Sequence, residues 1–525
     1  MREVKRLCLA LVLVLASCTS APPQPTPTPL PDVSGPATTL RVLAGSELAD
    51  LRPVLDEAAR ATGVTVKMTF TGSLEGAQTV ADGKADGNFD ALWFSSTRYL
   101  ETVPEARQRL GTSTRIMGSP VVLGLRRSVA DRLGWGARQV GWLEIAAAAG
   151  RGEFTFAMTD PAASNTGFSA LVAIASALDG SGRALDTAAI DRVAPQLAGF
   201  FAAQRLTAGS SGWLTDAFTG RGELDGLVNY EASLVALNKS GKLTEPLTLI
   251  YPRDGVISAD YPLTLLGGSG DAARDAHKRL SEFLRFPDTQ RKITELTSRR
   301  AAVPGVALPQ GFPDKLSELP FPGTRDAVDA LLTAYFDRLR RPSRTVYVLD
   351  TSGSMQGERL AALKRSLSTL TGVDTSLTGK YCRFRSREDV VLLPFNHAPL
   401  PVRAFTVDAQ NPQPSRDAIR GAIDGLVAAG DTAVYDSLVR AYDELTGTDR
   451  FLSIVLMTDG ESNTGRSLAD FTAFAAGRQI RVFPILFGEA AESQMREVAT
   501  LTGGELFDAR DSDLAQVFCQ IRGYQ

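Results

Sequence analysis

Hydrophobic residues along the first 340 positions fall into short runs that are separated by helical patterns. Residues 40–44 are mostly apolar, residues 64–70 alternate between apolar and polar positions, and leucines recur at helical spacing over residues 48–58. A further apolar run covers residues 91–94. Strands that alternate with helices predict a mostly parallel sheet, so an α/β fold is expected for residues 40–340.

The same alternation returns over residues 344–525. Apolar runs at residues 346–350, 390–395, 451–458 and 480–487 predict buried strands, and residues 402–407 predict an antiparallel edge strand. The last helix is indicated by Leu514, Val517, Phe518 and Ile521, which stand at positions i, i+3, i+4 and i+7. A second, doubly wound α/β domain is therefore expected.

A break in the pattern separates the two domains. Residues 320–324 read Pro-Phe-Pro-Gly-Thr, and Thr324 is placed to cap a helix that runs to Leu339. Four residues, 340–343, then precede the next strand, so we expect a semi-rigid junction rather than a long linker. The length of 525 residues agrees with two or three folded domains.

The first 18 residues have the pattern of an export signal. A basic start precedes an apolar run at residues 7–15, which is too short for a permanent membrane span. Leu15-Ala16-Ser17-Cys18 resembles a bacterial lipobox, which implies cleavage before Cys18, lipid on that residue and a protein anchored to the cell membrane outside the cytoplasm. An ordinary signal peptide and an uncleaved anchor are the alternatives. Residues 19–39 are rich in proline and predict an extended tether.

Composition narrows the classes of partner. The chain is 44% hydrophobic and 22% charged, as a folded globular protein is, and its net charge is −3. Because this charge creates no strong positive field, we expect neither a nucleic-acid partner nor binding to an anionic membrane surface, and contact with the membrane through the lipid anchor alone.

Oxygen-bearing side chains gather at strand ends in the second domain. Asp350 ends one predicted strand, Ser352 and Ser354 follow at alternate positions, Thr432 lies in a loop before a helix, and Asp459 ends another strand. An oxygen-only set of ligands suits a hard cation such as Mg²⁺ or Mn²⁺, and strand ends of a parallel sheet meet at one edge. For the first segment alone, a turn whose Asp and Ser cap the next helix is the plainer interpretation.

With these five residues present in this order, residues 344–525 resemble the von Willebrand factor type A family and its metal-ion-dependent adhesion site (MIDAS). The resemblance implies a Rossmann-like domain in which Ser352, Ser354 and Thr432 bind the ion directly. Asp350 and Asp459 would hold the water ligands of the ion, and a protein partner would supply an acidic group to complete its coordination.

Two of the four cysteines fall within the domain that resembles this family. Cys8 and Cys18 belong to the export segment, which leaves Cys382 and Cys519. In the resembled family the two helices near these residues are neighbours, and two remaining cysteines outside the cytoplasm favour a disulfide. Two separately buried thiols are the alternative.

Small polar residues also recur at the strand ends of the first domain, where open α/β sheets bind ligands. The candidates for ligand binding are Ser46, Glu47, Thr71, Ser73, Ser95, Thr159, Asn165, Thr166 and Tyr230. For each of them taken alone, a helix cap or a turn is the alternative.

The order of these segments resembles type 2 periplasmic solute-binding proteins, most closely the molybdate-binding-like group. The resemblance rests on the strand-end segments and on residues 119–125, 159–167, 227–231 and 248–255. It implies two lobes with a solute between them.

In that arrangement lobe one would comprise residues 40–117 and 249–340, and lobe two residues 118–247. Helix starts that face the cleft favour an anionic group. However, Glu47 and Glu231 stand at or beside cleft positions, and carboxylates that face the cleft disfavour a bare oxyanion and favour a cationic, neutral or metal-bearing solute. For either glutamate, a side chain that faces solvent is the alternative.

The sequence favours a binding protein over an enzyme. The two histidines, His277 and His397, stand in no recognisable catalytic arrangement with a serine or cysteine. We expect an extracytoplasmic lipoprotein that binds a small-molecule solute and, through Mg²⁺, a protein partner, with the two sites linked across the short junction. The alternatives are a solute receptor for an ABC-type importer with the metal domain as an accessory, and an enzyme subunit, because some relatives of the metal domain serve ATP-driven metal insertion.

Overall fold

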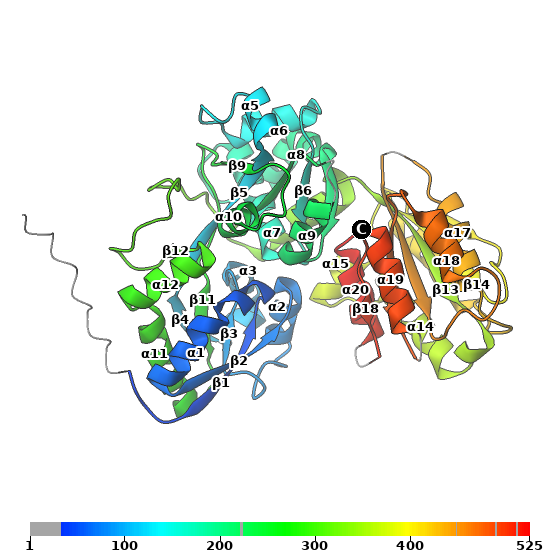
Figure 1. Cartoon of the computed structure of the whole chain (residues 1–525), viewed down its shortest axis with the longest axis horizontal. Coiled ribbons are helices and arrows are strands. Elements are labelled where there is room, and N and C mark those ends of the chain that lie inside the picture. Colours follow the sequence, from blue (N-terminus) through cyan, green and yellow to red (C-terminus); the bar gives the residue numbers. More distant parts are fainter. Residues whose placement is uncertain (1–32, 221–223, 448, 489–490, 511–512) are drawn as a thin grey trace, which may run out of the picture.

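The alternating strands and helices fold into three sheets with helices packed on them (Figure 1). The computed structural model describes residues 33–525 except 221–223, 448, 489–490 and 511–512. The expected export segment, Cys18 and most of the proline-rich tether lie outside the described residues.

Lobe one is built on a five-stranded sheet in the order β2-β1-β3-β11-β4. Its strands are β1 (Thr38–Ala44), β2 (Val64–Phe70), β3 (Ala91–Trp93), β4 (Leu110–Arg115) and β11 (Pro262–Leu266). β1 is parallel to β2 and β3, whereas β11 is antiparallel to β3 and β4. The helices are η1 (Ser46–Leu51), α1 (Arg52–Thr62), α2 (Ser73–Ala81), α3 (Arg98–Glu101), α4 (Pro104–Arg107), α11 (Asp271–Leu284) and α12 (Pro287–Thr297).

Lobe two is organised around the long strand β5 (Met117–Arg126). The sheet order is β10-β5-β8-β6-β7, and β9 and β12 also pair with β5. The other strands are β6 (Phe156–Thr159), β7 (Gln204–Ala208), β8 (Gly226–Tyr230), β9 (Leu247–Ile250), β10 (Ser258–Ala259) and β12 (Arg300–Ala301). The helices are α5 (Arg127–Arg132), α6 (Trp142–Gly150), α7 (Asn165–Asp179), α8 (Thr187–Ala202), α9 (Ser211–Gly220) and α10 (Glu231–Lys239).

The point at which the chain returns to lobe one differs from the expected one. The sequence placed this return at residue 249, but β9 pairs with β5 from Leu247 to Ile250 and is therefore part of the sheet of lobe two. The chain rejoins the sheet of lobe one at β11, which begins at Pro262. Backbone hydrogen bonds to β5, which the hydrophobic pattern does not reveal, determine this boundary.

The junction is a helix packed on lobe two. Thr324 accepts a hydrogen bond from the Ala327 amide at 3.3 Å and caps α13 (Arg325–Ala334), which continues as η2 (Tyr335–Leu339). The Tyr335 ring lies 4.9 Å from the ring of Phe201, and its hydroxyl donates to Gln204 at 3.2 Å. The short connection is thus held against lobe two by ring packing and by a hydrogen bond.

The C-terminal domain has a six-stranded sheet in the order β15-β14-β13-β16-β17-β18. Its strands are β13 (Ser343–Asp350), β14 (Asp389–Phe395), β15 (Arg403–Thr406), β16 (Phe451–Thr458), β17 (Arg481–Leu486) and β18 (Phe507–Asp508). The helices are η3 (Gly353–Met355), α14 (Glu358–Ser368), η4 (Thr369–Val373), α15 (Leu377–Cys382), α16 (Pro412–Asp424), α17 (Val434–Asp443), α18 (Leu468–Ala475), α19 (Glu492–Thr502) and α20 (Leu514–Arg522).

Helices cover both faces of this sheet, because alternate residues of β13 point to opposite sides. Val346 and Val348 join a core with α17, α18 and α19, whereas Tyr347 and Leu349 join a core with α14, α16 and α20. The second core continues into lobe two, where it includes Leu206 and Phe218. The expected doubly wound fold is therefore confirmed, and its core is shared with lobe two.

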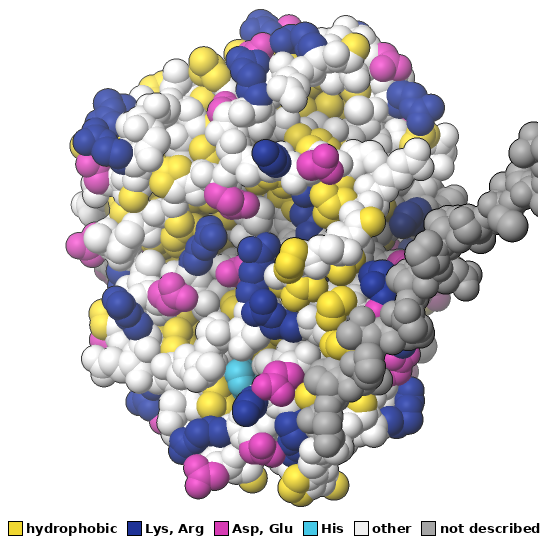
Figure 2. Space-filling view, turned by 90° about the vertical axis from the view of Figure 1, so that its left-hand side faces the viewer, with side chains coloured by type: hydrophobic (Ala, Val, Ile, Leu, Met, Phe, Trp, Pro, Cys, Tyr) yellow, Lys and Arg dark blue, Asp and Glu magenta, His cyan; other side chains and the backbone are white. Residues whose placement is uncertain are grey.

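Charges of both signs are mixed on one face of the molecule. Figure 2 shows Lys and Arg side chains interspersed with Asp and Glu on the face formed by the lobes. In the part of the chain that the structure describes, no helix has the length and apolar character needed to cross a bilayer.

Candidate solute cleft and metal site

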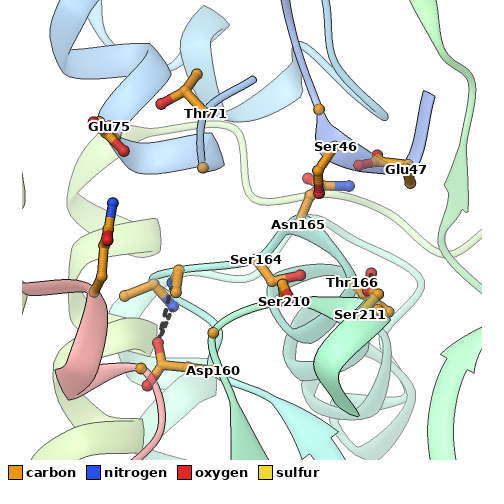
Figure 3. A pocket seen from close by; sticks show the side chains of 18 of the residues that line it. Ser46, Glu47, Thr71, Glu75, Asp160, Ser164, Asn165, Thr166, Ser210 and Ser211 are labelled. Carbon is orange, nitrogen blue, oxygen red and sulfur yellow. Dashed lines mark hydrogen bonds between the residues drawn. The ribbon is translucent and has the colours of Figure 1, made fainter. Parts of the chain in front are cut away.

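A cavity of about 1360 Å³ lies between the two lobes. Figure 3 shows side chains of lobe one, among them Ser46 and Glu47, facing those of lobe two, among them Asn165 and Thr166. Of the residues proposed from the sequence, the cavity is lined by Ser46, Glu47, Thr71, Ser95, Asn165, Thr166 and Tyr230. Side chains from distant segments thus meet in one cleft.

The side of the cleft formed by lobe two is built from the end of β8 and the start of α7. Asn165 donates its amide hydrogen to the hydroxyl of Tyr230 at 2.9 Å, and the hydroxyls of Thr166 and Ser211 lie 2.8 Å apart. Burial and the nearby Glu47 carboxylate raise the pKa of Tyr230 to about 12. Tyr230 therefore presents a neutral hydroxyl to the cleft at physiological pH.

Glu47 is an acidic residue on the side of the cavity that lobe one forms. Its carboxylate folds back over Gly45, where a Cβ atom would lie 2.5 Å from Glu47 Oε2, so glycine leaves room for it. Burial raises the pKa of Glu47 above its ordinary value, although a backbone hydrogen bond and Arg299 oppose the shift. Arg299 itself is paired with Asp50 at 2.8 Å.

Two of the proposed ligand-binding residues are placed differently. Thr159 is fully buried and does not line the cavity, because it packs beneath α7, where a Cβ on Gly167 would lie 2.2 Å from the Thr159 carbonyl oxygen. Ser73 begins α2, but its side chain lies outside those that the structure describes.

Glu231 does not face the cleft, contrary to the expectation. It is fully buried, and Arg300 donates to both of its carboxylate oxygens at 2.7 and 2.8 Å. Tyr251 adds a third hydrogen bond at 2.7 Å. Tyr230 ends β8 and Glu231 begins α10, so the neighbouring side chains point in different directions.

Several cleft residues were missed in the sequence. Ser210 and Ser211 follow β7, Ser164 precedes α7, and Asp160 follows β6. All four stand at strand ends or helix starts, which is where open α/β sheets bind ligands. Including every polar residue at these positions would have found them.

The proposed metal residues meet at the carboxyl edge of the C-terminal sheet. The Ser352 amide donates to Asp350 Oδ1 at 2.8 Å, the hydroxyls of Ser352 and Ser354 lie 2.9 Å apart, and Ser354 donates to Asp459 Oδ1 at 2.7 Å. Four of the five proposed oxygen-bearing residues thus form one continuous hydrogen-bonded chain.

The fifth residue, Thr432, is brought to the same edge by the backbone. The Gly353 amide donates to the Gly430 carbonyl at 2.8 Å, which joins the loop before α17 to the loop after β13. Thr432 is 5% exposed, and its amide donates to Asn463 at 2.8 Å. Its loop is therefore fixed from both sides.

Charge at this edge is negative and partly compensated. Burial raises the pKa of Asp350, the Asp459 charge adds to the shift, and hydrogen bonds from Thr458 and Ser352 oppose it. Arg359 pairs with the fully buried Asp459 at 2.6 Å. Two carboxylates and three hydroxyls are the hard oxygen ligands that Mg²⁺ prefers, so the residues present fit a divalent cation of this kind.

The two remaining cysteines are joined. Cys382, at the end of α15, and Cys519, in α20, form a disulfide with their Cα atoms 5.0 Å apart. The bond closes a loop with a sequence separation of 137.

Comparison with known proteins agrees with this architecture. Residues 40–295 match the family model of bacterial extracellular solute-binding proteins, and residues 346–520 match that of von Willebrand factor type A domains. No curated protein sequence matches the chain.

Among solved structures, the periplasmic binding protein AfuA from Actinobacillus pleuropneumoniae, with fructose-6-phosphate bound, is 12% identical and has a TM-score of 0.45; the match covers 57% of this chain and 98% of AfuA. Apo ferric ion-binding protein A from Pasteurella haemolytica is 14% identical, with a TM-score of 0.43 and coverage of 57% and 94%. Iron-bound HitA from Pseudomonas aeruginosa is 15% identical, with a TM-score of 0.42 and coverage of 56% and 94%.

Proposed function

The chain joins a bacterial extracellular solute-binding domain to a von Willebrand factor type A domain, and from this premise we propose that it is an extracytoplasmic binding lipoprotein. Its N-terminal domain binds a small-molecule solute. Its C-terminal domain binds a protein partner through a divalent cation, Mg²⁺ or Mn²⁺. Lipid on Cys18 holds the protein at the cell membrane.

The hydrogen-bonded chain from Asp350 to Asp459 is the observation that carries the metal-dependent part. In this proposal Ser352, Ser354 and Thr432 hold the cation directly, and Asp350 and Asp459 hold its water ligands. Bound Mg²⁺ would supply an open coordination position for a carboxylate of the partner. The protein's own part is to keep these oxygens close together before the cation arrives.

The lining of the cleft supports a neutral or cationic solute. Hydroxyl and amide groups from both lobes line the cavity together with Glu47. Each cationic side chain of the described lining is already paired with a carboxylate: Arg299, Arg340, Arg522, Lys84 and Lys242. A bare oxyanion would meet the Glu47 charge without a free cation to offset it. A solute rich in hydroxyl groups or bearing a positive charge matches these groups better.

Two measurements on the purified full-length protein test the proposal. Native mass spectrometry reports any solute and metal ion that remain bound. Partner capture from cell-envelope extract, with and without EDTA, tests whether binding needs the metal. We expect capture to be lost in EDTA and in Asp350→Ala. Capture that survives both, with a solute still bound, would favour a receptor for an importer instead.

Replacing Arg359 with glutamine should make the protein more dependent on Mg²⁺. Without metal, the substitution leaves the buried Asp459 carboxylate without its partner, which should cost roughly 1–3 kcal/mol because Arg359 is itself partly exposed. Mg²⁺ would replace the lost positive charge. Calorimetry should therefore show a larger rise in melting temperature between EDTA and Mg²⁺ for Arg359→Gln than for the wild type.

Arg365→Gln is the matched control, because Arg365 pairs with the exposed Glu358 on the same helix. It should leave the Mg²⁺ response unchanged. An equal Mg²⁺ response in Arg359→Gln and wild type would contradict the proposed location of the metal.

Tyr230→Phe should weaken binding of the solute that native mass spectrometry identifies by about five- to tenfold, as expected for the loss of one hydrogen bond. The ring remains to fill the buried position, but the Asn165 amide loses its acceptor, so a small fall in melting temperature should accompany the weaker binding. Titration calorimetry measures the affinity. Tyr442→Phe is the control, since that hydroxyl lies in the C-terminal domain without a hydrogen-bond partner among the described residues. Unchanged affinity in Tyr230→Phe would show that the Tyr230 hydroxyl does not bind the solute.

A further inference from the structure

The solute cavity has a third wall, which the C-terminal domain supplies. Besides residues of both lobes, the lining includes Ser376 and Thr378 near the start of α15, and Gln516, Gln520 and Tyr524 in and after α20. Figure 3 shows a pale red segment from the end of the chain bordering the pocket opposite Glu75. At about 1360 Å³ the cavity exceeds the ~300–1,000 Å³ typical of small-molecule sites.

Both helices of this wall reach lobe one. The Gln516 amide of α20 donates to the Glu75 carboxylate of α2. The Leu377 backbone amide, at the start of α15, donates to the Gln78 side chain at 2.6 Å. Glu75 and Gln78 are one turn apart on α2, and both line the cavity, so these contacts stand at the edge of the cleft.

The same wall also packs against lobe two. The Tyr524 ring packs edge-on against Trp213 with centroids 4.8 Å apart. Gly523 approaches so closely that a Cβ there would lie 3.0 Å from Gly209 Cα and 3.1 Å from the Ala163 side chain. Tyr524 and Leu214 belong to one buried cluster. The contact with lobe two is therefore apolar and close. The contact with lobe one combines these hydrogen bonds with two apolar side chains of α15, Leu377 and Tyr381, which belong to the same buried cluster as residues of α2.

The disulfide links the contact that the C-terminal domain makes with lobe one to the contact that it makes with lobe two. Cys382 ends α15 and Cys519 lies in α20, so the bond ties α15, which touches lobe one, to the helix whose following turn packs on lobe two. A relative movement of the lobes must then strain or break one of the two contacts. Hydrogen bonds to side chains at the cleft edge, together with only two apolar side chains of α15, are easier to open than the extended apolar core that the C-terminal domain shares with lobe two.

We propose that α15 and α20, joined by the Cys382–Cys519 disulfide, form a brace that sets the separation of the two lobes across the cleft. Opening and closing of the cleft then occur at the contact of α2 with α15 and α20, while the contact with lobe two stays closed. The brace links the position of α20 to the state of the cleft. It depends neither on metal binding nor on the identity of the solute.

Hydrogen exchange of the full-length protein, followed by mass spectrometry, tests the brace without any ligand. Gln516→Ala should speed amide exchange in α2 about threefold to tenfold, as expected for the loss of one hydrogen bond. Cys382→Ser with Cys519→Ser, which separates α15 from α20, should also speed amide exchange in α2. Exchange in α8 of lobe two should not change. Gln413→Ala is the control, because Gln413 is an exposed residue of α16 that bonds to Asp417.

Unchanged exchange of α2 in Gln516→Ala would overturn the brace, even if the protein without the disulfide failed to fold. An equal increase in α2 and α8 would also overturn it, because it would report general loosening rather than release of one contact. Failure of solute or metal binding would leave both results unaffected.

Discussion

Glu388→Gln is expected to lower the free energy of unfolding of the C-terminal domain by about 3–5 kcal/mol, the cost of removing one partner from a buried ion pair. Glu388 is 1% exposed and lies between two buried arginines. Arg340 donates to one carboxylate oxygen at 2.7 Å, and Arg522 to the other at 2.5 Å. Glutamine keeps the shape but leaves both guanidinium groups without a counter-charge.

The difference in the free energy of unfolding between the wild type and Glu388→Gln should also depend on pH, which provides a second test. Burial alone would raise the pKa of Glu388, but Arg522 and Arg340 outweigh it and hold the pKa below its ordinary value of 4.5. The stabilisation is therefore fully present above pH 4.5 and is lost as the pH falls through the pKa of the folded state. The gap between the wild type and Glu388→Gln should be constant near neutral pH and should shrink in acid.

Denaturant unfolding of both proteins over a range of pH measures the gap. Glu358→Gln serves as the matched control, since Glu358 forms an exposed pair with Arg365 whose loss should cost less than ~1 kcal/mol. A loss for Glu388→Gln no larger than for this control would show that the buried arginines do not depend on Glu388.

Removal of the disulfide is the second large effect. Cys382→Ser with Cys519→Ser should lower the free energy of unfolding of the C-terminal domain by about 4–5 kcal/mol, because the bond closes a loop with a sequence separation of 137 and so restricts the unfolded chain. Differential scanning calorimetry should show a fall of roughly 10 °C in the transition of this domain.

Wild-type protein that is reduced under denaturing conditions and refolded with the reductant present should have a transition temperature close to that of the double variant. This control distinguishes the effect of losing the disulfide from any effect of the serine side chains. Transition temperatures that agree between oxidised wild type and double variant would contradict a stabilising disulfide.

The sequence predicted that the proposed metal residues meet at one edge of the sheet, because the ends of the two strands can be recognised from local sequence. Asp350 ends β13, and the pairing of Leu349 with Met457 brings the end of β16 and Asp459 beside it. Two apolar runs that each end on an aspartate are visible in the sequence, and parallel neighbours place their ends together. The position of Thr432 depends on hydrogen bonds between loops, among them those from Gly353 to Gly430 and from Thr432 to Asn463, which no sequence pattern marks.

The directions of side chains and the contacts between domains could not be predicted from the sequence. Glu231 was expected near the cleft because it follows Tyr230, yet it turns to Arg300, which is 69 residues away. Thr159 stands at a strand end as expected, but the close approach of Gly167 seals it beneath a helix. The third wall of the cleft joins the half-buried Glu75 to the exposed Gln516, and these residues are 441 positions apart.

Titration calorimetry of Mg²⁺ into metal-free protein tests the central claim most directly. Thr432→Ala removes one proposed ligand from a loop held by its backbone, and Thr446→Ala, an exposed residue beyond the far end of α17, is the matched control. The account predicts one Mg²⁺ site in the wild type and in Thr446→Ala, with affinity at least about tenfold weaker in Thr432→Ala. Equal affinity in all three proteins, or no binding in the wild type, would contradict it.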